Sequence, residues 1–245
     1  MCDADALLHH KIKHTQKMQT LRYNAYNEIH KALRAELYET ALLLQQTDFY
    51  SEKNAAPAFK RINNVLNLFD GHAHHEDKHI MPLVKQFDEA TYNTIESEHA
   101  TDEALTHQLQ NKMDAYENAA TENNRIRIGN DIMYLFIEFV AFNLSHMNKE
   151  EHLINEILWT NFTDEEIMQV SNAIRAEIPP QEMVQVFQLM AKGVSNLELI
   201  KMLTGMQTAM PPDVFDQFLK MTEAVLPPAR MERVNEGLKE DILFY

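Results

Sequence analysis

The sequence predicts an all-α protein, in which an up-down-up-down four-helix bundle is followed by an array of short helices. Only five of the 245 residues are glycine, and strong helix formers such as Leu, Ala, Glu and Lys dominate the composition. Four long stretches repeat apolar residues at helical spacing, and three Pro-Pro pairs then divide the last third into short segments. We therefore expect an N-terminal segment at 1–17, the bundle at 18–160 and a C-terminal helical extension at 161–245.

Composition and charge argue against several classes of function. The formal net charge of -15 argues against binding to nucleic acid or to anionic membrane surfaces. Cys2 is the only cysteine, so the sequence predicts no disulfide framework, zinc ribbon or iron–sulfur ligand set. The N-terminus lacks a signal-peptide pattern, and no apolar run approaches the roughly 18 residues that span a bilayer. We expect a soluble, cytoplasmic protein.

The first bundle helix is expected from Met18 to Gln46. Its apolar stripe is formed by Tyr26, Ile29, Leu33, Leu37, Ala41 and Leu44. His30 lies on this stripe. Considered by itself, a histidine in such a place is more often a hydrogen-bonded core residue than a metal ligand.

The second helix is expected after a loop at 47–56, with Pro57 in its first turn and its end near Pro82. It carries His72 and Glu76, whose spacing of four residues places them on one face of the helix. A buried imidazole or carboxylate is costly unless it is satisfied, and a metal ion is the simplest group that satisfies both. His74, His75 and Asp77 are expected to point away from that face into solvent, and His79 is expected to lie outside the set of metal ligands.

The third and fourth helices supply further candidates. The third is expected from about Ala90 to the polar stretch at 115–124, with His99 on its inner side. The fourth is expected from about Arg125 to Trp159 and is strongly apolar in its first half. Its second half carries His146 and Glu150, which repeat the four-residue spacing of the second helix.

The extension is expected to contain short helices at about 164–177, 181–191, 196–208, 212–225 and 228–239. Thr163 with Glu166, and Ser195 with Glu198, have the spacing of capping boxes. The apolar stripes of these helices are expected to pack as core against the bundle. The alternative is a methionine-rich surface that binds a protein partner.

Heights along the bundle can be compared by counting residues at about 1.5 Å each. In antiparallel helices joined by short loops, the counts place two single histidines and two His/Glu pairs in one layer. Six candidate metal ligands therefore converge: His30, His72, Glu76, His99, His146 and Glu150.

Imidazole and carboxylate ligands together suit iron, manganese or zinc. Two carboxylates that can bridge make a dinuclear site the simplest arrangement, with two imidazoles and one oxygen of each glutamate on each metal. Positions stay open for a small ligand such as O₂, peroxide or NO. A ferritin-like site is the competing arrangement, because Glu76/His79 and Glu96/His99 have Glu-x-x-His spacing. These two motifs, however, fall on consecutive helices, and the fourth helix offers none.

The order His, His-x-x-x-Glu, His, His-x-x-x-Glu on a four-helix bundle resembles the hemerythrin family over about residues 18–160. The segments that carry the resemblance are IHKALRAEL, HAHHEDKHIMPL, SEH and HMNKEEHLINEIL. The resemblance implies that the four histidines are terminal ligands, and that Glu76 and Glu150 bridge two non-haem irons.

One position departs from the oxygen-carrying members of that family, which have a fifth histidine one turn after the helix-three histidine. Glu103 stands there in this chain. It is open whether Glu103 is an extra ligand, a hydrogen-bond acceptor behind a ligand imidazole, or a surface acid. The resemblance therefore points to the wider hemerythrin-like group, which includes sensors of oxygen, NO and iron.

We expect a protein that binds O₂, NO or a related small oxidant as a sensor or handler. One alternative is a di-iron peroxidase or oxidase. The other is an iron-responsive interaction module, in which the metal is structural and the C-terminal helices bind a partner.

Overall fold

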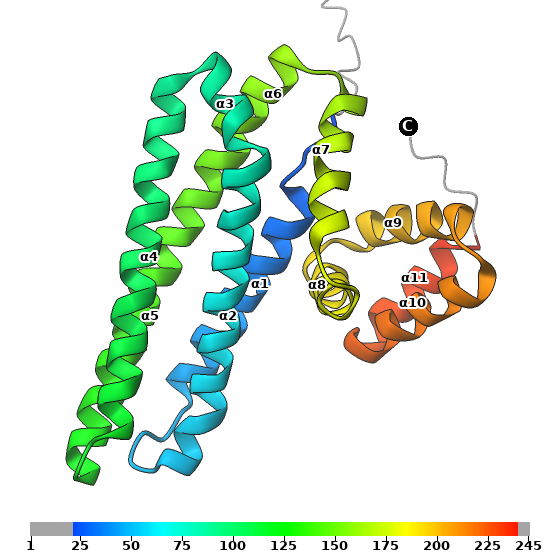
Figure 1. Ribbon diagram of the computed structural model, residues 1–245. Coiled ribbons are helices and arrows are strands. Elements are labelled where there is room, and N and C mark those ends of the chain that lie inside the picture. The colour runs from blue at the N-terminus through cyan, green and yellow to red at the C-terminus, as the bar shows by residue number, and fades with distance from the viewer. Residues whose placement is uncertain (1–21, 240–245) are drawn as a thin grey trace, which may run out of the picture.

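The computed structural model describes residues 22–239 and is all-helical over that range. The expected N-terminal segment at 1–17 lies outside the described residues. Four long helices lie side by side in Figure 1: α1 (Asn27–Gln45), α2 (Glu52–His79), α4 (Glu89–Glu117) and α5 (Glu122–Lys149). The short α3 (Met81–Phe87) connects α2 to α4. A π-helical segment, η1 (Glu150–Ile154), continues α5 into α6 (Asn155–Asn161).

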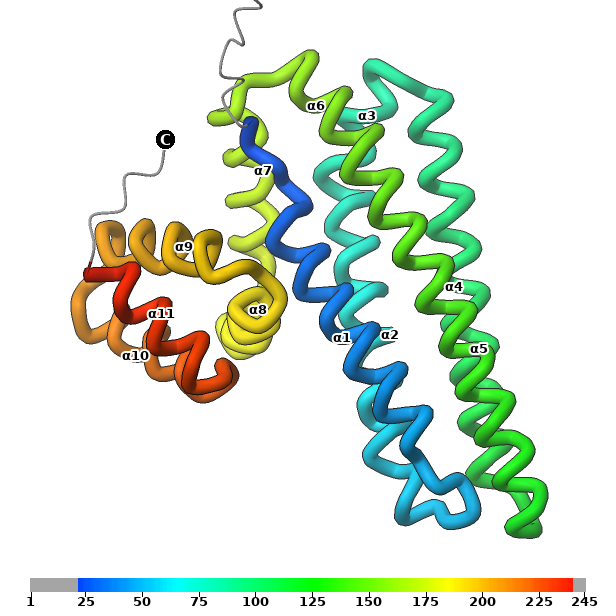
Figure 2. Tube along the Cα trace, turned by 180° about the vertical axis from the view of Figure 1, so that it is seen from behind, coloured from blue at the N-terminus to red at the C-terminus, as the bar shows by residue number. Residues whose placement is uncertain are grey.

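The extension consists of α7 (Asp164–Glu177), α8 (Pro180–Gly193), α9 (Asn196–Ala209), α10 (Pro212–Val225) and α11 (Pro228–Gly237). The second proline of each Pro-Pro pair opens a helix, where its missing N–H costs no helical hydrogen bond. Both predicted capping boxes are present. Figure 2 shows α8 against α1, and α8 also contacts α10, which is grouped with α9 and α11.

Two helix starts differ from the predictions. The first helix begins at Asn27 rather than near Met18, because the Asn24 side chain accepts hydrogen bonds from the backbone of Tyr26 and Asn27 and forms a turn there. The second helix begins at Glu52, so Pro57 lies inside it rather than in its first turn. Pro57 is on the exposed side of the helix, where water can satisfy the carbonyl group that it leaves unpaired.

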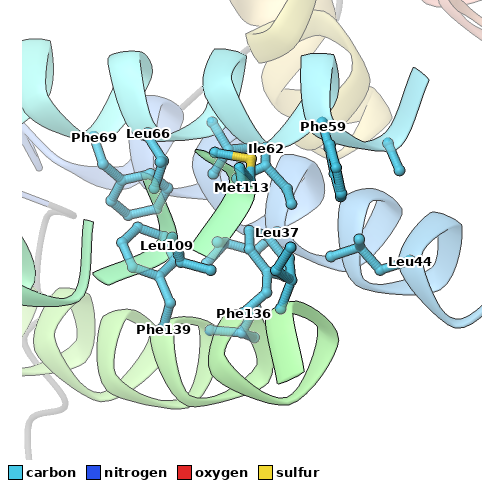
Figure 3. Close-up of a cluster of buried hydrophobic side chains, with 14 of the residues drawn as sticks. Leu37, Leu44, Phe59, Ile62, Leu66, Phe69, Leu109, Met113, Phe136 and Phe139 are labelled. Carbon is cyan, nitrogen blue, oxygen red and sulfur yellow. The ribbon is translucent and has the colours of Figure 1, made fainter. Parts of the chain in front are cut away.

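The bundle core is divided into two apolar clusters along the helix axis. The larger cluster fills the half of the bundle near the α1–α2 and α4–α5 connections, as Figure 3 shows for Leu37, Leu109 and Phe136. The smaller cluster, which includes Ile95 and Ile154, fills the opposite end. On α1, α2 and α4 the candidate ligands fall between these clusters. On the fourth helix, His146 and Glu150 lie on either side of Met147, the last residue of the larger cluster, and before Ile154 of the smaller one, so apolar layers lie on both sides of the site.

The extension has its own apolar core, formed by residues of α8–α11. Its contact with the bundle is partly polar: Lys31 of α1 pairs with Glu198, and Lys192 Nζ lies 2.8 Å from Glu39 Oε2. Gly193 sits directly against the backbone of α1. Among residues 22–239, none of the helices combines the length and apolar character needed to cross a membrane.

Candidate metal centre

The six candidate ligands meet between α1, α2, α4 and the junction of α5 with η1. Each long helix contributes from the face that also carries its core residues, which explains why side chains distant in sequence converge. His30 and Glu150 have fully buried side chains, and Glu76 is 3% exposed. The other three imidazoles are at most 14% exposed.

His30 and His72 form one half of the centre. Their Nε2 atoms lie 2.9 Å apart. Glu76 Oε1 is 3.3 Å from His72 Nε2, and Glu150 Oε2 is 3.4 Å from His30 Nε2. This half therefore offers two imidazole nitrogens and one oxygen from each glutamate.

His99 and His146 form the other half. Glu150 Oε1 lies 3.0 Å from His146 Nε2 and 3.6 Å from His99 Nε2. Glu76 Oε2 lies 3.5 Å from His99 Nε2. Each carboxylate thus directs one oxygen to each pair of imidazoles, which is the arrangement of a carboxylate that bridges two metal ions.

The residues present fit a pair of metal ions. All four oxygens of Glu76 and Glu150 are buried without a hydrogen bond, and so is His99 Nε2. Buried polar atoms in this number are costly unless they are satisfied by another group. Imidazole and carboxylate donors suit iron, manganese or zinc, and a cation among them would satisfy the unpaired atoms.

Three of the imidazoles are held from behind by carboxylates. Glu151 Oε1 lies 3.0 Å from His30 Nδ1, Asp77 Oδ1 lies 2.8 Å from His99 Nδ1, and Glu98 Oε2 lies 2.9 Å from His146 Nδ1. Such a partner holds the ring with its proton on Nδ1 and leaves Nε2 free for a metal.

The role of these three carboxylates is not evident from the sequence. Asp77 is exposed, as expected, but it also accepts a hydrogen bond from His99. A signal for the three carboxylates was nevertheless available. Each of them is the immediate neighbour of a candidate ligand, since Glu151 follows Glu150, Asp77 follows Glu76 and Glu98 precedes His99. Each serves an imidazole on a different helix, which cannot be read from a single helix.

The fourth helix was expected to be continuous from Arg125 to Trp159, but η1 interrupts it at the centre. Two consecutive residues of this π-helical segment, Glu150 and Glu151, both reach His30. Single π-helical turns are frequent at functional sites because they redirect side chains locally. Here the turn carries Glu150, a candidate ligand, and Glu151, the carboxylate behind the His30 imidazole.

The pKa values describe how the centre balances its charges without a metal. Burial, and then the neighbouring His30, lower the pKa of His72 to about 3, so this ring is neutral. Burial and the charge of Glu150 raise the pKa of Glu76 to about 8. Burial would raise the pKa of Glu150 too, but the neighbouring imidazoles of His146 and His99 hold that pKa well below its usual value.

In the His99/His146 half, protonated imidazoles therefore supply the positive charge that balances the carboxylates when no metal is bound. Burial would lower the pKa of His99, but the neighbouring carboxylates of Glu150 and Glu76 outweigh burial and raise that pKa to about 11. In His146, burial is likewise outweighed by Glu150 and Glu98, and the pKa rises to about 9. Both imidazoles are therefore doubly protonated and positively charged at neutral pH, and a metal ion would displace a proton from each ring.

Tyr26 closes the centre from the end of the smaller apolar cluster. Its ring centroid lies 4.8 Å from that of His30, and the side chain is buried. Burial and the charges of Glu76 and Glu150 raise the pKa of Tyr26 well above its usual value, so the hydroxyl stays protonated. The sequence had placed Tyr26 only on an apolar stripe.

Glu103 does not join the centre. Its side chain is 74% exposed and lies 3.6 Å from His107, so of the three roles considered for it the structure favours a surface acid. Asp102, its neighbour, is the acid that turns inward, where Asn143 donates a 2.6 Å hydrogen bond to it. A ferritin-like site would need His79 in the centre, but His79 faces Glu177 of α7 instead.

Comparison with known proteins agrees with this geometry. The family profile described as the hemerythrin HHE cation binding domain matches residues 22–158. Neither the curated proteins nor the solved structures gave a significant match. The matched region contains all six candidate ligands and covers more than half of the chain. The chain therefore belongs to the hemerythrin HHE cation-binding domain family.

Proposed function

We propose that this centre binds two non-haem iron ions, and that the protein uses them in the cytoplasm to bind O₂, NO or a related small oxidant as a sensor or handler. One observation carries the proposal. Glu76 and Glu150 each place one oxygen beside the His30/His72 pair and the other beside the His99/His146 pair.

The donor set supports iron. Each half offers two imidazole nitrogens and two carboxylate oxygens, which leaves positions open on an ion that prefers six ligands. When bound, the irons would supply redox electrons and open positions for a small ligand. Manganese and zinc accept the same donor atoms, so the identity of the metal is part of the proposal.

The surroundings favour a ligand of a few atoms. Apolar clusters enclose the centre on both sides, and Tyr26 places a protonated hydroxyl beside it. These apolar surroundings and the single hydroxyl beside the centre support a small-ligand binder more than an enzyme with an organic substrate.

The test is anaerobic loading with Fe²⁺, followed by metal analysis and optical spectra before and after addition of O₂ or NO. We expect two irons per chain and a new charge-transfer absorption with one of these ligands. Glu150→Gln should lower the iron content to one or fewer, since the amide can offer its single oxygen to only one of the two ions. Glu103→Gln, on the exposed face of α4, is the matched control and should retain two irons.

A folded wild-type protein that takes up less than one metal ion per chain would contradict the shared centre. Retention of two irons by Glu150→Gln would contradict its bridging role. Steady turnover of peroxide would favour a di-iron peroxidase. Loading without any spectral response to O₂, NO or peroxide would favour a structural metal in an interaction module.

A further inference from the structure

A second group of metal-binding side chains lies where α2 meets α7, outside the centre described above. His75 and His79 are four residues apart on α2 and therefore lie on one face of the helix, one turn apart. Glu177, the last residue of α7, faces them, with its Oε1 3.2 Å from His79 Nε2. One donor atom from each of the three residues lies within 4.8 Å of the others.

The contacts within this group leave it incomplete. His75 Nδ1 and His79 Nε2 are both buried atoms without a hydrogen bond. His79 Nε2 is near Glu177, but the geometry of that contact is not that of a hydrogen bond. Protonation of His79 would strengthen one ion pair and would still leave the nitrogen of His75 unpaired. A shared cation would satisfy both nitrogens.

We propose that His75, His79 and Glu177 form a separate, mononuclear site for a transition-metal ion, with Zn²⁺ as the best-fitting ion. Two imidazoles and one carboxylate form a known zinc ligand set, in which water takes the fourth tetrahedral position. Ligand atoms about 2.0–2.1 Å from the ion lie about 3.4 Å apart. His79 Nε2 and Glu177 Oε1 are already 3.2 Å apart, and no pair of donor atoms is more than 4.8 Å apart, so the largest approach needed is about 1.4 Å.

The sequence at this site reads HEDKH, which has the H-E-x-x-H spacing of zinc hydrolases. In those enzymes the glutamate acts as the general base for the metal-bound water. Here Glu76 points into the bundle, where its oxygens lie beside His72 and His99. The outer site therefore lacks the hydrolytic base, and we assign it to metal binding without hydrolysis.

The outer site connects the two parts of the molecule. His75 and His79 belong to the bundle, whereas Glu177 belongs to the extension, so an ion held by all three would tie α7 to α2. Without a metal, Lys78 forms an ion pair with Glu177, in which Nζ lies 2.7 Å from Oε1. Half of the Lys78 side chain is exposed, so it can turn into solvent when a cation arrives.

The test is equilibrium dialysis of the full, iron-loaded chain against Zn²⁺, with zinc and iron counted in the same sample. Wild-type protein should bind one zinc per chain beyond whatever fills the inner centre. His79→Ala should weaken that binding at least tenfold, and Glu177→Gln should weaken it as well. His74→Ala is the matched control, because this exposed histidine of the same helix lies outside the site and should leave zinc binding unchanged.

A spectrum with Co²⁺ in place of Zn²⁺ should show the intense visible bands of a four-coordinate ion in wild type and not in His79→Ala. The proposal is overturned if wild type binds no additional zinc, or if His79→Ala binds as much as His74→Ala. Iron content is the separate readout: it should be equal in all variants. Glu177→Gln, at an exposed helix end, keeps the test valid if His79→Ala does not fold.

Discussion

Replacing Glu151 by glutamine tests how the centre depends on the carboxylates behind its imidazoles. Glu151 Oε1 lies 3.0 Å from His30 Nδ1 and 2.7 Å from the guanidinium of Arg34. Glutamine has nearly the same size and can still accept the Nδ1–H hydrogen bond through its amide oxygen. The substitution therefore removes the negative charge behind the ring and leaves the packing in place.

The size of the effect follows from that difference. A hydrogen bond to a charged group contributes about 1.5–3 kcal/mol, roughly twice as much as a hydrogen bond between neutral groups. The glutamine amide should therefore retain about half of the contribution that the Glu151 carboxylate makes. The Glu151 side chain is 23% exposed and shares its charge with Arg34, which reduces the loss to about 1 kcal/mol. This corresponds to about fivefold weaker metal binding by Glu151→Gln. Glu151→Ala also loses the hydrogen bond, so its metal affinity should fall by an amount approaching the 10–100-fold range seen when such hydrogen-bond partners of metal ligands are removed.

The assay is anaerobic competition for Fe²⁺ between the protein and a chelator of known affinity. Glu156→Gln, at an exposed position on α6, is the matched control for the loss of one negative charge. Circular dichroism should show an unchanged helical content in all variants. An affinity of Glu151→Gln equal to that of Glu156→Gln would refute the reasoning, as would equal affinities of Glu151→Gln and Glu151→Ala.

Three further predictions concern protons, packing and pH. In the metal-free centre, His99 and His146 are protonated and positively charged at pH 7. Loading with Fe²⁺ should therefore release at least one proton per chain in a pH-stat, and the affinity for iron should increase as pH rises. Loading without proton release would contradict this prediction. Gly193→Ala would place a Cβ 2.6 Å from a backbone oxygen of α1, and it should lower the free energy of unfolding by about 1–3 kcal/mol in urea titrations. Gly205→Ala is the control: it has open space around its Cβ and should raise the free energy of unfolding by about 0.4–1 kcal/mol. Burial would raise the pKa of Glu198, but hydrogen bonds from α1 outweigh burial and lower that pKa to about 2. The ionised carboxylate should therefore stabilise the folded state fully above about pH 4.5 and lose this effect as pH falls towards 2. The melting temperature of Glu198→Gln should fall less than that of wild type over this pH range.

Much of the fold was predictable because its signals are local. Helical periodicity, capping boxes and paired prolines each act within a few residues, and the helices of the extension begin close to where these signals predict. The errors are local as well. A side-chain turn at Asn24 shortens the first helix, and the second helix tolerates Pro57 on its exposed side.

The centre was predictable only where periodicity carries the information. His72 with Glu76, and His146 with Glu150, are visible as pairs because four residues bring side chains to one helix face. The single histidines His30 and His99 become candidate ligands only when heights along antiparallel helices are compared. The place of Tyr26 beside the centre has no signal in the sequence, since its stripe position is that of an ordinary core residue.

The sequence by itself therefore determined the helices, their antiparallel order and the six side chains that share one layer, since these depend on spacing along the chain. Only the tertiary structure decided how the carboxylates divide their oxygens between the two imidazole pairs, and which acids stand behind the rings. It also decided that Glu103 faces solvent while Asp102 turns inward. The physical reason is that these choices depend on the rotation of each helix about its axis, which packing against the other helices sets.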